Sequence, residues 1–273
     1  MKQLLRILIL SVLVLSSCGE YDKLLKSTDY ELKMTRAKEY FNKGQYVKSS
    51  ELLSQVIPMY RGSSDAEELA YMFAMCFYRM NDYFTAGSYF KEFIEQFPFG
   101  VHAEEGFYLA AYCDYKQSPR PELDQATTLS AIDGLNLFID HFPSSEKVPE
   151  AKILIKELEE KLVEKSYTSA RLYYDMQKYK ASITALENGL KTHANTKYRE
   201  EMLFLKLNSL FKYAELSLPS KQTERYQDTL DEYYSFMEEY PKSSFSKQVS
   251  DIFEKTNNYL KGKNIADGNK ESK

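Results

Sequence analysis

Paired glutamates are the side chains in this sequence that most resemble an acid–base pair. They occur three times, always near the start of a stretch with helical periodicity: Glu67-Glu68, Glu104-Glu105 and Glu200-Glu201. The helix dipole stabilises a carboxylate in the first turn of a helix, and this structural role accounts for each pair. The histidines lie far apart at predicted helix boundaries and lack the spacing of a zinc site: His102, His141 and His193. The sequence therefore predicts no catalytic site, no bound metal and no cofactor.

Cys18 is the residue whose surroundings predict a covalent modification. Residues 1–17 place Lys2 and Arg6 around the start of a short apolar run, which is typical of an export signal and too short to cross a bilayer as a helix. The run ends in Leu15-Ser16-Ser17-Cys18, which resembles the lipobox of bacterial lipoproteins. Several acyl chains on one cysteine anchor a protein stably. We therefore expect residues 1–17 to be a signal peptide and the mature chain to be tethered to a membrane through Cys18.

The composition favours packed helices. Gly (10) and Pro (8) are scarce among 273 residues, whereas Tyr (23) and Phe (16) are abundant, and few breakers with many large side chains suit helices better than a loop-rich β fold. The formal net charge is −4, and no clustered basic face is evident. Because nucleic-acid binding requires such a face, we expect no nucleic-acid partner.

Five segments share one pattern of small and large side chains at helical spacing. They begin at Tyr46, Tyr83, Thr128, Tyr179 and Tyr226. Three positions later each has a small residue: Ser49, Ala86, Ala131, Ser182 and Thr229. Four further on each has a large one: Leu53, Phe90, Leu135, Leu186 and Tyr233. Pro98, Pro143 and Pro241 stop three of the helices, since proline cannot continue a helix. With a helix expected before each segment, the pattern resembles the tetratricopeptide repeat.

The fold class predicted is all-α, a superhelical array of about five tetratricopeptide-like hairpins with a long connecting helix over 148–176. A linker at 18–30 precedes a repeat domain at 31–261. The hairpins are expected at about 33–60, 66–98, 103–143, 148–194 and 198–241, followed by a helix at 243–261 and a disordered tail at 262–273. Residues 116–127, KQSPRPELDQAT, lengthen the turn of the third hairpin.

Cys76 and Cys113 occupy the same repeat position in adjacent hairpins. Equivalent positions on neighbouring packed helices lie about 8–10 Å apart. A disulfide requires Cα atoms within about 7 Å. We therefore favour two free thiols in the core.

The first helices of hairpins two and three carry aromatic residues on the face expected to line the inner surface of the array. The predicted groove is lined by Tyr71, Met75, Tyr78, Arg79, Tyr108, Tyr112, Tyr115 and Lys116. An aromatic trough with Arg79 and Lys116 at one rim suits an extended peptide that has aromatic side chains and a carboxylate end. The alternative is that half of these tyrosines pack between hairpins.

Residues 89–155 and 158–190, including SPRPELDQ at 118–125, resemble the BamD family of outer-membrane β-barrel assembly lipoproteins in its Bacteroidetes-type form. The resemblance implies a non-catalytic lipoprotein on the outer membrane, facing the periplasm. It further implies N-terminal hairpins that bind unfolded outer-membrane barrel proteins, and C-terminal hairpins that dock on the POTRA domains of a BamA-like insertase.

The sequence departs from the family at one contact, because the arginine expected in the second helix of hairpin four is Ala185. Two other functions remain open: a tetratricopeptide adaptor lipoprotein of another envelope pathway, and a SusD-like glycan-binding lipoprotein, which would be roughly twice as long.

Overall fold

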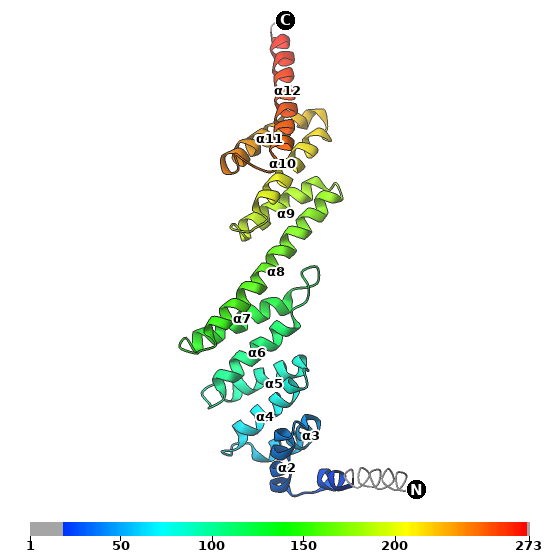
Figure 1. Ribbon diagram of the computed structural model, residues 1–273. Helices are drawn as coiled ribbons and strands as arrows, with labels where there is room; N and C mark the ends of the chain where they lie inside the picture. The colour runs from blue at the N-terminus through cyan, green and yellow to red at the C-terminus, as the bar shows by residue number, and fades with distance from the viewer. Residues whose placement is uncertain (1–18, 272–273) are drawn as a thin grey trace, which may run out of the picture. The chain divides into compact units, whose positions relative to one another are not determined.

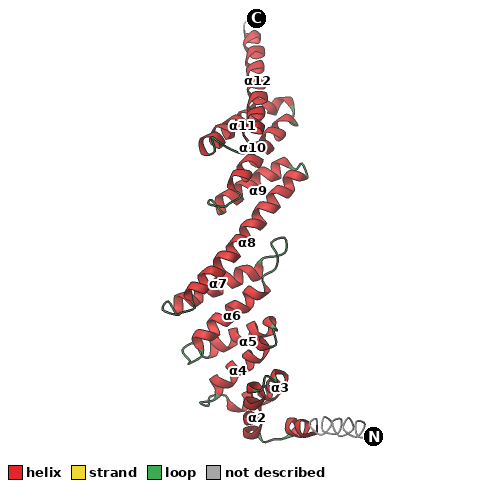
Figure 2. Ribbon diagram, in the orientation of Figure 1, coloured by secondary structure: helices red, strands yellow, loops and turns green. Residues whose placement is uncertain are grey.

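The computed structural model describes residues 19–271, and these fold into α-helices and connecting loops without a strand (Figure 2). The all-α prediction is therefore confirmed for this part of the chain. Cys18 and the signal segment at 1–17 lie outside the described residues, as do residues 272 and 273.

Ten of the helices pair as five hairpins, in chain order (Figure 1). Their first helices are α2 (Tyr30–Asn42), α4 (Ala66–Arg79), α6 (Ala103–Gln117), α8 (Val148–Asp175) and α10 (Arg199–Glu215). Their second helices are α3 (Tyr46–Val56), α5 (Tyr83–Gln96), α7 (Ala126–His141), α9 (Tyr179–Thr192) and α11 (Pro219–Glu239). A short 3-10 helix, η1 (Ile57–Tyr60), follows α3, and α12 (Ser246–Glu271) ends the described chain.

The chain divides into two compact units. Unit 1 contains the first three hairpins and the first part of α8. It is formed by the chain up to Pro119 and by Gln125–Leu158. Unit 2 contains the chain from Glu159 onward together with the loop segment Arg120–Asp124. The Lys165 ammonium donates a 2.6 Å hydrogen bond to the Leu123 carbonyl of that segment. The long connecting helix predicted from the sequence is α8.

The small and large positions of the repeat pattern are the positions at which the second helices bury their side chains. All five small positions are fully buried, and the hydroxyl of Ser49 donates to the Ala37 carbonyl of the preceding helix at 2.9 Å. Four of the five large positions have no exposed area: Leu53, Phe90, Leu135 and Leu186. Each such burial stabilises the fold by about 1.5–3 kcal/mol. Tyr233 differs, because its ring remains partly exposed and stacks on Phe253 at 4.4 Å.

The second helices end where the prolines predict. Helices α5, α7 and α11 each stop two residues before Pro98, Pro143 and Pro241, because proline disfavours helical backbone in the residue before it. Helix α9 stops at the same repeat position without a proline. The residue after it, His193, has φ −124° and ψ 62°, close to the φ −130° and ψ 57° of Phe97 after α5.

Both ends of the described chain contain more helix than the sequence pattern indicates. Residues 19–26, expected as a linker, are helical and bury Tyr21 against the first hairpin. Helix α12 continues to Glu271, through residues expected to form a disordered tail. No proline interrupts residues 262–271, and extending an existing helix costs much less than nucleating one.

Cys76 and Cys113 are both free and buried, as predicted from their spacing. They belong to different hydrophobic clusters, Cys76 with Leu52 and Leu69 and Cys113 with Phe90 and Leu135. Burial raises the pKa of the Cys76 thiol to about 11 and that of Cys113 to about 12. Both thiols therefore stay protonated and unreactive at neutral pH.

Candidate functional site

The paired glutamates join successive hairpins. In each pair the first carboxylate reaches forward to the loop before the next hairpin or, in the case of Glu200, to the loop before α12. Glu67 accepts the His102 backbone N–H at 2.8 Å, Glu104 accepts the Ser145 hydroxyl at 2.6 Å, and Glu200 accepts the Ser243 hydroxyl at 2.7 Å.

The second carboxylate of each pair reaches back to the preceding first helix. Glu68 forms a 2.6 Å ion pair with Lys38, and Glu201 forms a 3.0 Å ion pair with Arg171. Glu105 lies beside the Tyr71 hydroxyl. The pairs therefore fasten neighbouring first helices within each unit. This pairing is more specific than the dipole role expected for them.

The histidines of unit 1 are also part of the packing. His102 stacks on the Tyr71 ring at 4.2 Å between ring centroids, with an interplanar angle of 6°. His141 stacks on Phe107 at 4.9 Å, and its Nδ1 lies 2.9 Å from the Leu137 carbonyl oxygen. Among residues 19–271 no group of histidine, cysteine and acidic side chains is arranged to hold a metal ion.

Six of the eight predicted groove residues lie at the surface of α4 and α6. Tyr71, Tyr78, Tyr112 and Tyr115 are half-buried, and Arg79 and Lys116 are exposed. Between ring centroids, Tyr78 and Tyr112 are 6.4 Å apart, and Tyr112 and Tyr115 are 5.6 Å apart. Since aromatic rings interact favourably at such separations, these three tyrosines form a continuous aromatic row across two hairpins. The six surface residues are called the trough below.

The prediction was wrong for Met75 and Tyr108, which are only 5% and 4% exposed. Both belong to the core cluster that contains Phe90 and Leu135. The Lys147 ammonium also lies over the Tyr108 ring, 4.6 Å from its centroid. Met75 and Tyr108 therefore support the trough from beneath and cannot line it.

The trough presents phenol rings and two basic side chains. Burial first, and then the Glu105 carboxylate, raise the pKa of Tyr71 far above its usual value. The hydroxyl of Tyr115 donates a 2.7 Å hydrogen bond to Glu157, which raises the Tyr115 pKa to about 12. The Lys116 ammonium lies 5.6 Å from the centroid of the Tyr83 ring. A ligand in the trough would meet aromatic rings along its length and positive charge at one end.

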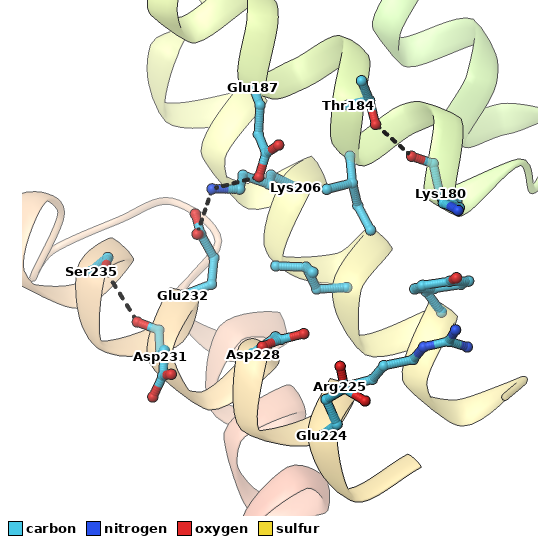
Figure 3. Close-up of a pocket in the computed structure, with 13 residues that line it drawn as sticks. Lys180, Thr184, Glu187, Lys206, Glu224, Arg225, Asp228, Asp231, Glu232 and Ser235 are labelled. Atoms are coloured by element: carbon cyan, nitrogen blue, oxygen red, sulfur yellow. Dashed lines mark hydrogen bonds and ion pairs between the residues drawn. The ribbon is translucent and has the colours of Figure 1, made fainter. Parts of the chain in front are cut away.

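Unit 2 contains two clefts that the repeat pattern does not predict. The first, of about 560 Å³, lies among α9, α10 and α11 and is rich in charged side chains (Figure 3). Lys206 stands between two carboxylates, with its ammonium 2.7 Å from Glu232 and 3.5 Å from Glu187. Burial raises the pKa of Glu232, and Lys206 opposes that rise.

The second cleft, of about 800 Å³, is mostly apolar and lies around the start of α9 and the end of α10. Its walls include Tyr173, Tyr213, Leu216 and Ala185, and its charged lining residues include two lysines and no carboxylate. We call it the Ala185 groove. Leu216, which lies just after α10, is 71% exposed, and an apolar side chain in a turn is the sequence signal that could have revealed this surface.

Comparison with known proteins identifies the protein family of this chain. The YfiO family, described as outer membrane lipoprotein, matches residues 31–220. The chain belongs to this family.

Two relatives carry a more particular description. The outer membrane protein assembly factor BamD of Caulobacter vibrioides is 28% identical over 127 residues, a match that covers 46% of this chain and 42% of that protein. The match therefore spans less than half the length of that relative. The putative outer membrane protein assembly factor BamD of Aquifex aeolicus is 23% identical over 280 residues, covering 95% of this chain and 84% of that protein.

Solved tetratricopeptide structures also resemble the chain. The P58(IPK) TPR domain is 14% identical with a TM-score of 0.41, covering 89% of this chain and 68% of that structure. The TPR2AB domain of yeast Sti1 is 12% identical with a TM-score of 0.37, covering 84% of this chain and 98% of that structure. In the described part of the chain, no helix is both long and apolar enough to span a membrane.

Proposed function

We propose that this chain is a lipoprotein subunit of an outer-membrane β-barrel assembly machine, tethered through acylated Cys18 and facing the periplasm. The observation that carries the proposal is the family match over residues 31–220, together with the BamD description of two relatives. In this function the chain binds other proteins and performs no catalysis itself.

The trough is the proposed site for unfolded barrel proteins. Its tyrosines provide flat surfaces on which aromatic side chains of an extended segment can stack. Arg79 and Lys116 are exposed at one end, where a carboxylate would be stabilised by charge-assisted hydrogen bonds. These features support a client segment with aromatic side chains and a free C-terminal carboxylate.

The Ala185 groove is the proposed contact for the insertase. The resemblance stated above implies an arginine contact at the position of Ala185, and alanine cannot make it. The position instead lines an apolar groove beside the exposed side chain of Leu216. Apolar burial can replace a lost ion pair, because about 25 cal/mol is gained for each Å² of apolar surface removed from water.

The function is tested by purifying the tethered full-length chain from its own membranes and identifying the proteins that accompany it. We expect a barrel protein with POTRA domains among them. Purification without such a protein would contradict the assembly function and favour an adaptor of another envelope pathway.

The trough is tested separately with a synthetic peptide that ends in a C-terminal phenylalanine. Arg79→Glu should raise the dissociation constant of the peptide about tenfold, which corresponds to about 1.4 kcal/mol. Arg61→Glu is the matched control, because Arg61 is an exposed arginine of the same unit outside the trough. Equal affinities of the two variants would rule out Arg79 as the carboxylate contact.

A further inference from the structure

One edge of unit 1 exposes a large apolar side chain in each of its three hairpins. Val47, Phe84 and Leu129 occupy the same repeat position near the start of α3, α5 and α7, and they are 59%, 74% and 51% exposed. In unit 2 the same position holds Lys180 and Gln227. Single exposed apolar residues are ordinary on protein surfaces, but a series at one repeat position indicates an interaction surface.

Basic side chains lie near two of these three residues. Lys43 and Lys48 lie on either side of Val47 in the sequence. Arg79 ends α4, and Phe84 follows it across the turn that connects α4 to α5. Asp82 is the acidic residue of that turn, and its carboxylate already accepts the Thr85 backbone N–H at 3.1 Å. These basic side chains are complementary to an anionic surface, and the carboxylates one helical turn beyond Val47 and Leu129 are those of Glu51 and Asp133.

The N-terminal end of the described chain is fixed to this edge. Tyr21, which is 9% exposed, donates a 3.2 Å hydrogen bond to the Lys48 carbonyl and also bonds to Glu51. The Lys48 ammonium lies 5.2 Å from the centroid of the Tyr21 ring. Cys18 precedes Tyr21 by three residues, and three residues of fully extended chain span at most about 10 Å.

We propose that this edge, defined by Val47, Phe84 and Leu129 and called the apolar edge, lies against the surface of the phospholipid bilayer. The proposal rests on the proposed acylation of Cys18, which brings the bilayer within about 10 Å of Tyr21. Apolar side chains flanked by lysine and arginine are suited to the interface between headgroups and acyl chains. The tether makes this contact intramolecular, so that weak individual contacts are sufficient to orient unit 1.

The absence of tryptophan from the sequence allows a direct test. The full-length acylated chain is prepared as the Phe84→Trp variant and reconstituted into vesicles of phosphatidylcholine and phosphatidylglycerol, with or without brominated acyl chains. We expect the indole emission to shift to shorter wavelength and to lose most of its intensity with brominated lipid.

Phe99→Trp is the matched control. Phe99 is 95% exposed and lies just beyond the C-terminal end of α5, whereas Phe84 lies at its start. The fourteen residues of α5 separate the two positions by about 20 Å. The Phe99→Trp emission should therefore be unaffected by brominated lipid. Equal quenching of the two variants, or quenching of neither, would overturn the proposal.

Two further outcomes separate this proposal from its premise. If the full-length chain is not acylated and does not associate with vesicles, the proposed lipoprotein function fails. If it is acylated and bound but the Phe84→Trp emission is unquenched, only the orientation fails. A lipid-free dimer that Phe84→Asp converts to a monomer would assign the apolar edge to a second copy of the chain and would also overturn the proposal.

Discussion

Unit 1 and unit 2 bury the same repeat positions but expose different ones. Phe138 of α7 and Phe236 of α11 are equivalent residues, and both are fully buried. The second position of the repeat segments that begin at Thr128 and Tyr226 is exposed in both units. It is the apolar Leu129 in α7 and the polar Gln227 in α11. The buried positions define a hairpin that is common to both units, and the exposed ones distinguish what each unit can bind.

The units also differ in which helices carry their candidate surface. In unit 1 the trough lies on the first helices, α4 and α6, which carry an aromatic row. In unit 2 the clefts involve a second helix, α9, and include charged side chains such as Lys206 and Glu232. This difference is consistent with the proposal that the two units recognise different partners.

Loss of a core phenylalanine should have the largest effect and should test whether the units are separate energetically. We expect Phe138→Ala and Phe236→Ala each to reduce the free energy of unfolding by about 3–5 kcal/mol, because each leaves a cavity in a fully packed site. Phe138 belongs to the cluster with Phe90, and Phe236 to the cluster with Phe211. Hydrogen exchange should therefore lose protection mainly in unit 1 for the first variant and in unit 2 for the second. Uniform loss in both would show that they unfold as one.

The partly buried ion pair between Lys206 and Glu232 in unit 2 should have the next largest effect. Lys206→Met leaves Glu232 without its 2.7 Å partner, and the side chain of Glu232 is 11% exposed. We expect the free energy of unfolding at neutral pH to fall by on the order of 2 kcal/mol. Thermal or denaturant unfolding measures this loss. The control is Lys221→Met, whose partner Glu224 is exposed, so the effect should be close to zero.

The same variant should change the dependence of stability on pH. Burial holds the folded-state pKa of Glu232 above its unfolded value. The folded state therefore binds the proton more tightly, and this group lowers stability as pH rises through its folded pKa. Removing Lys206 raises that pKa further, so the deficit of Lys206→Met should shrink as pH falls and Glu232 becomes protonated. A deficit independent of pH would show that the lost packing of the lysine stem is responsible.

Blocking the Ala185 groove should weaken the proposed insertase contact without affecting the trough. We expect Ala185→Trp to reduce recovery of the POTRA-containing protein at least about tenfold, equivalent to about 1.4 kcal/mol. Ala194→Trp places the same side chain at an exposed position just after α9, outside the groove, and should leave recovery unchanged. Binding of the C-terminal peptide to the trough should be normal in both variants. If both variants recover the insertase equally, the contact lies elsewhere.

The sequence predicts the helices well because their signals are local. Small and large residues recur at helical spacing, and Pro98, Pro143 and Pro241 mark three helix ends. The burial of Ser49 and Leu53 follows from the same spacing. These features depend on residues only a few positions apart.

The candidate surfaces were harder to predict because they depend on contacts between hairpins. Tyr108 lies on the same helical face as Tyr112, but Lys147 from the following loop lies over its ring. The forward and backward bonds of the glutamate pairs join residues more than 29 positions apart. Periodicity within one helix contains no information about such contacts. It therefore wrongly predicts Met75 and Tyr108 at the surface and does not predict the unit 2 clefts.

The smallest expected effect concerns the turns within hairpins, where the two units can be compared at one backbone position. Gly44 and Asn81 in unit 1 have φ values of 71° and 60°, and Gln177 in unit 2 has φ 56°. Left-handed backbone costs an ordinary residue about 1–2 kcal/mol, whereas glycine adopts it freely and asparagine tolerates it. Gln177→Gly should therefore raise the free energy of unfolding by about 1 kcal/mol, measured by denaturant titration.

Gly44→Gln is the reciprocal change in unit 1 and should lower stability by a similar amount. No side chain lies within 4 Å of the position that a Cβ would occupy at Gly44, so backbone strain is the expected cause of the loss. If Gln177→Gly were destabilising, side-chain contacts of Gln177 would outweigh its strained backbone. Gln177 lines the Ala185 groove. That result would therefore indicate that the glutamine is retained in this turn for its side-chain contacts, at a cost in backbone strain.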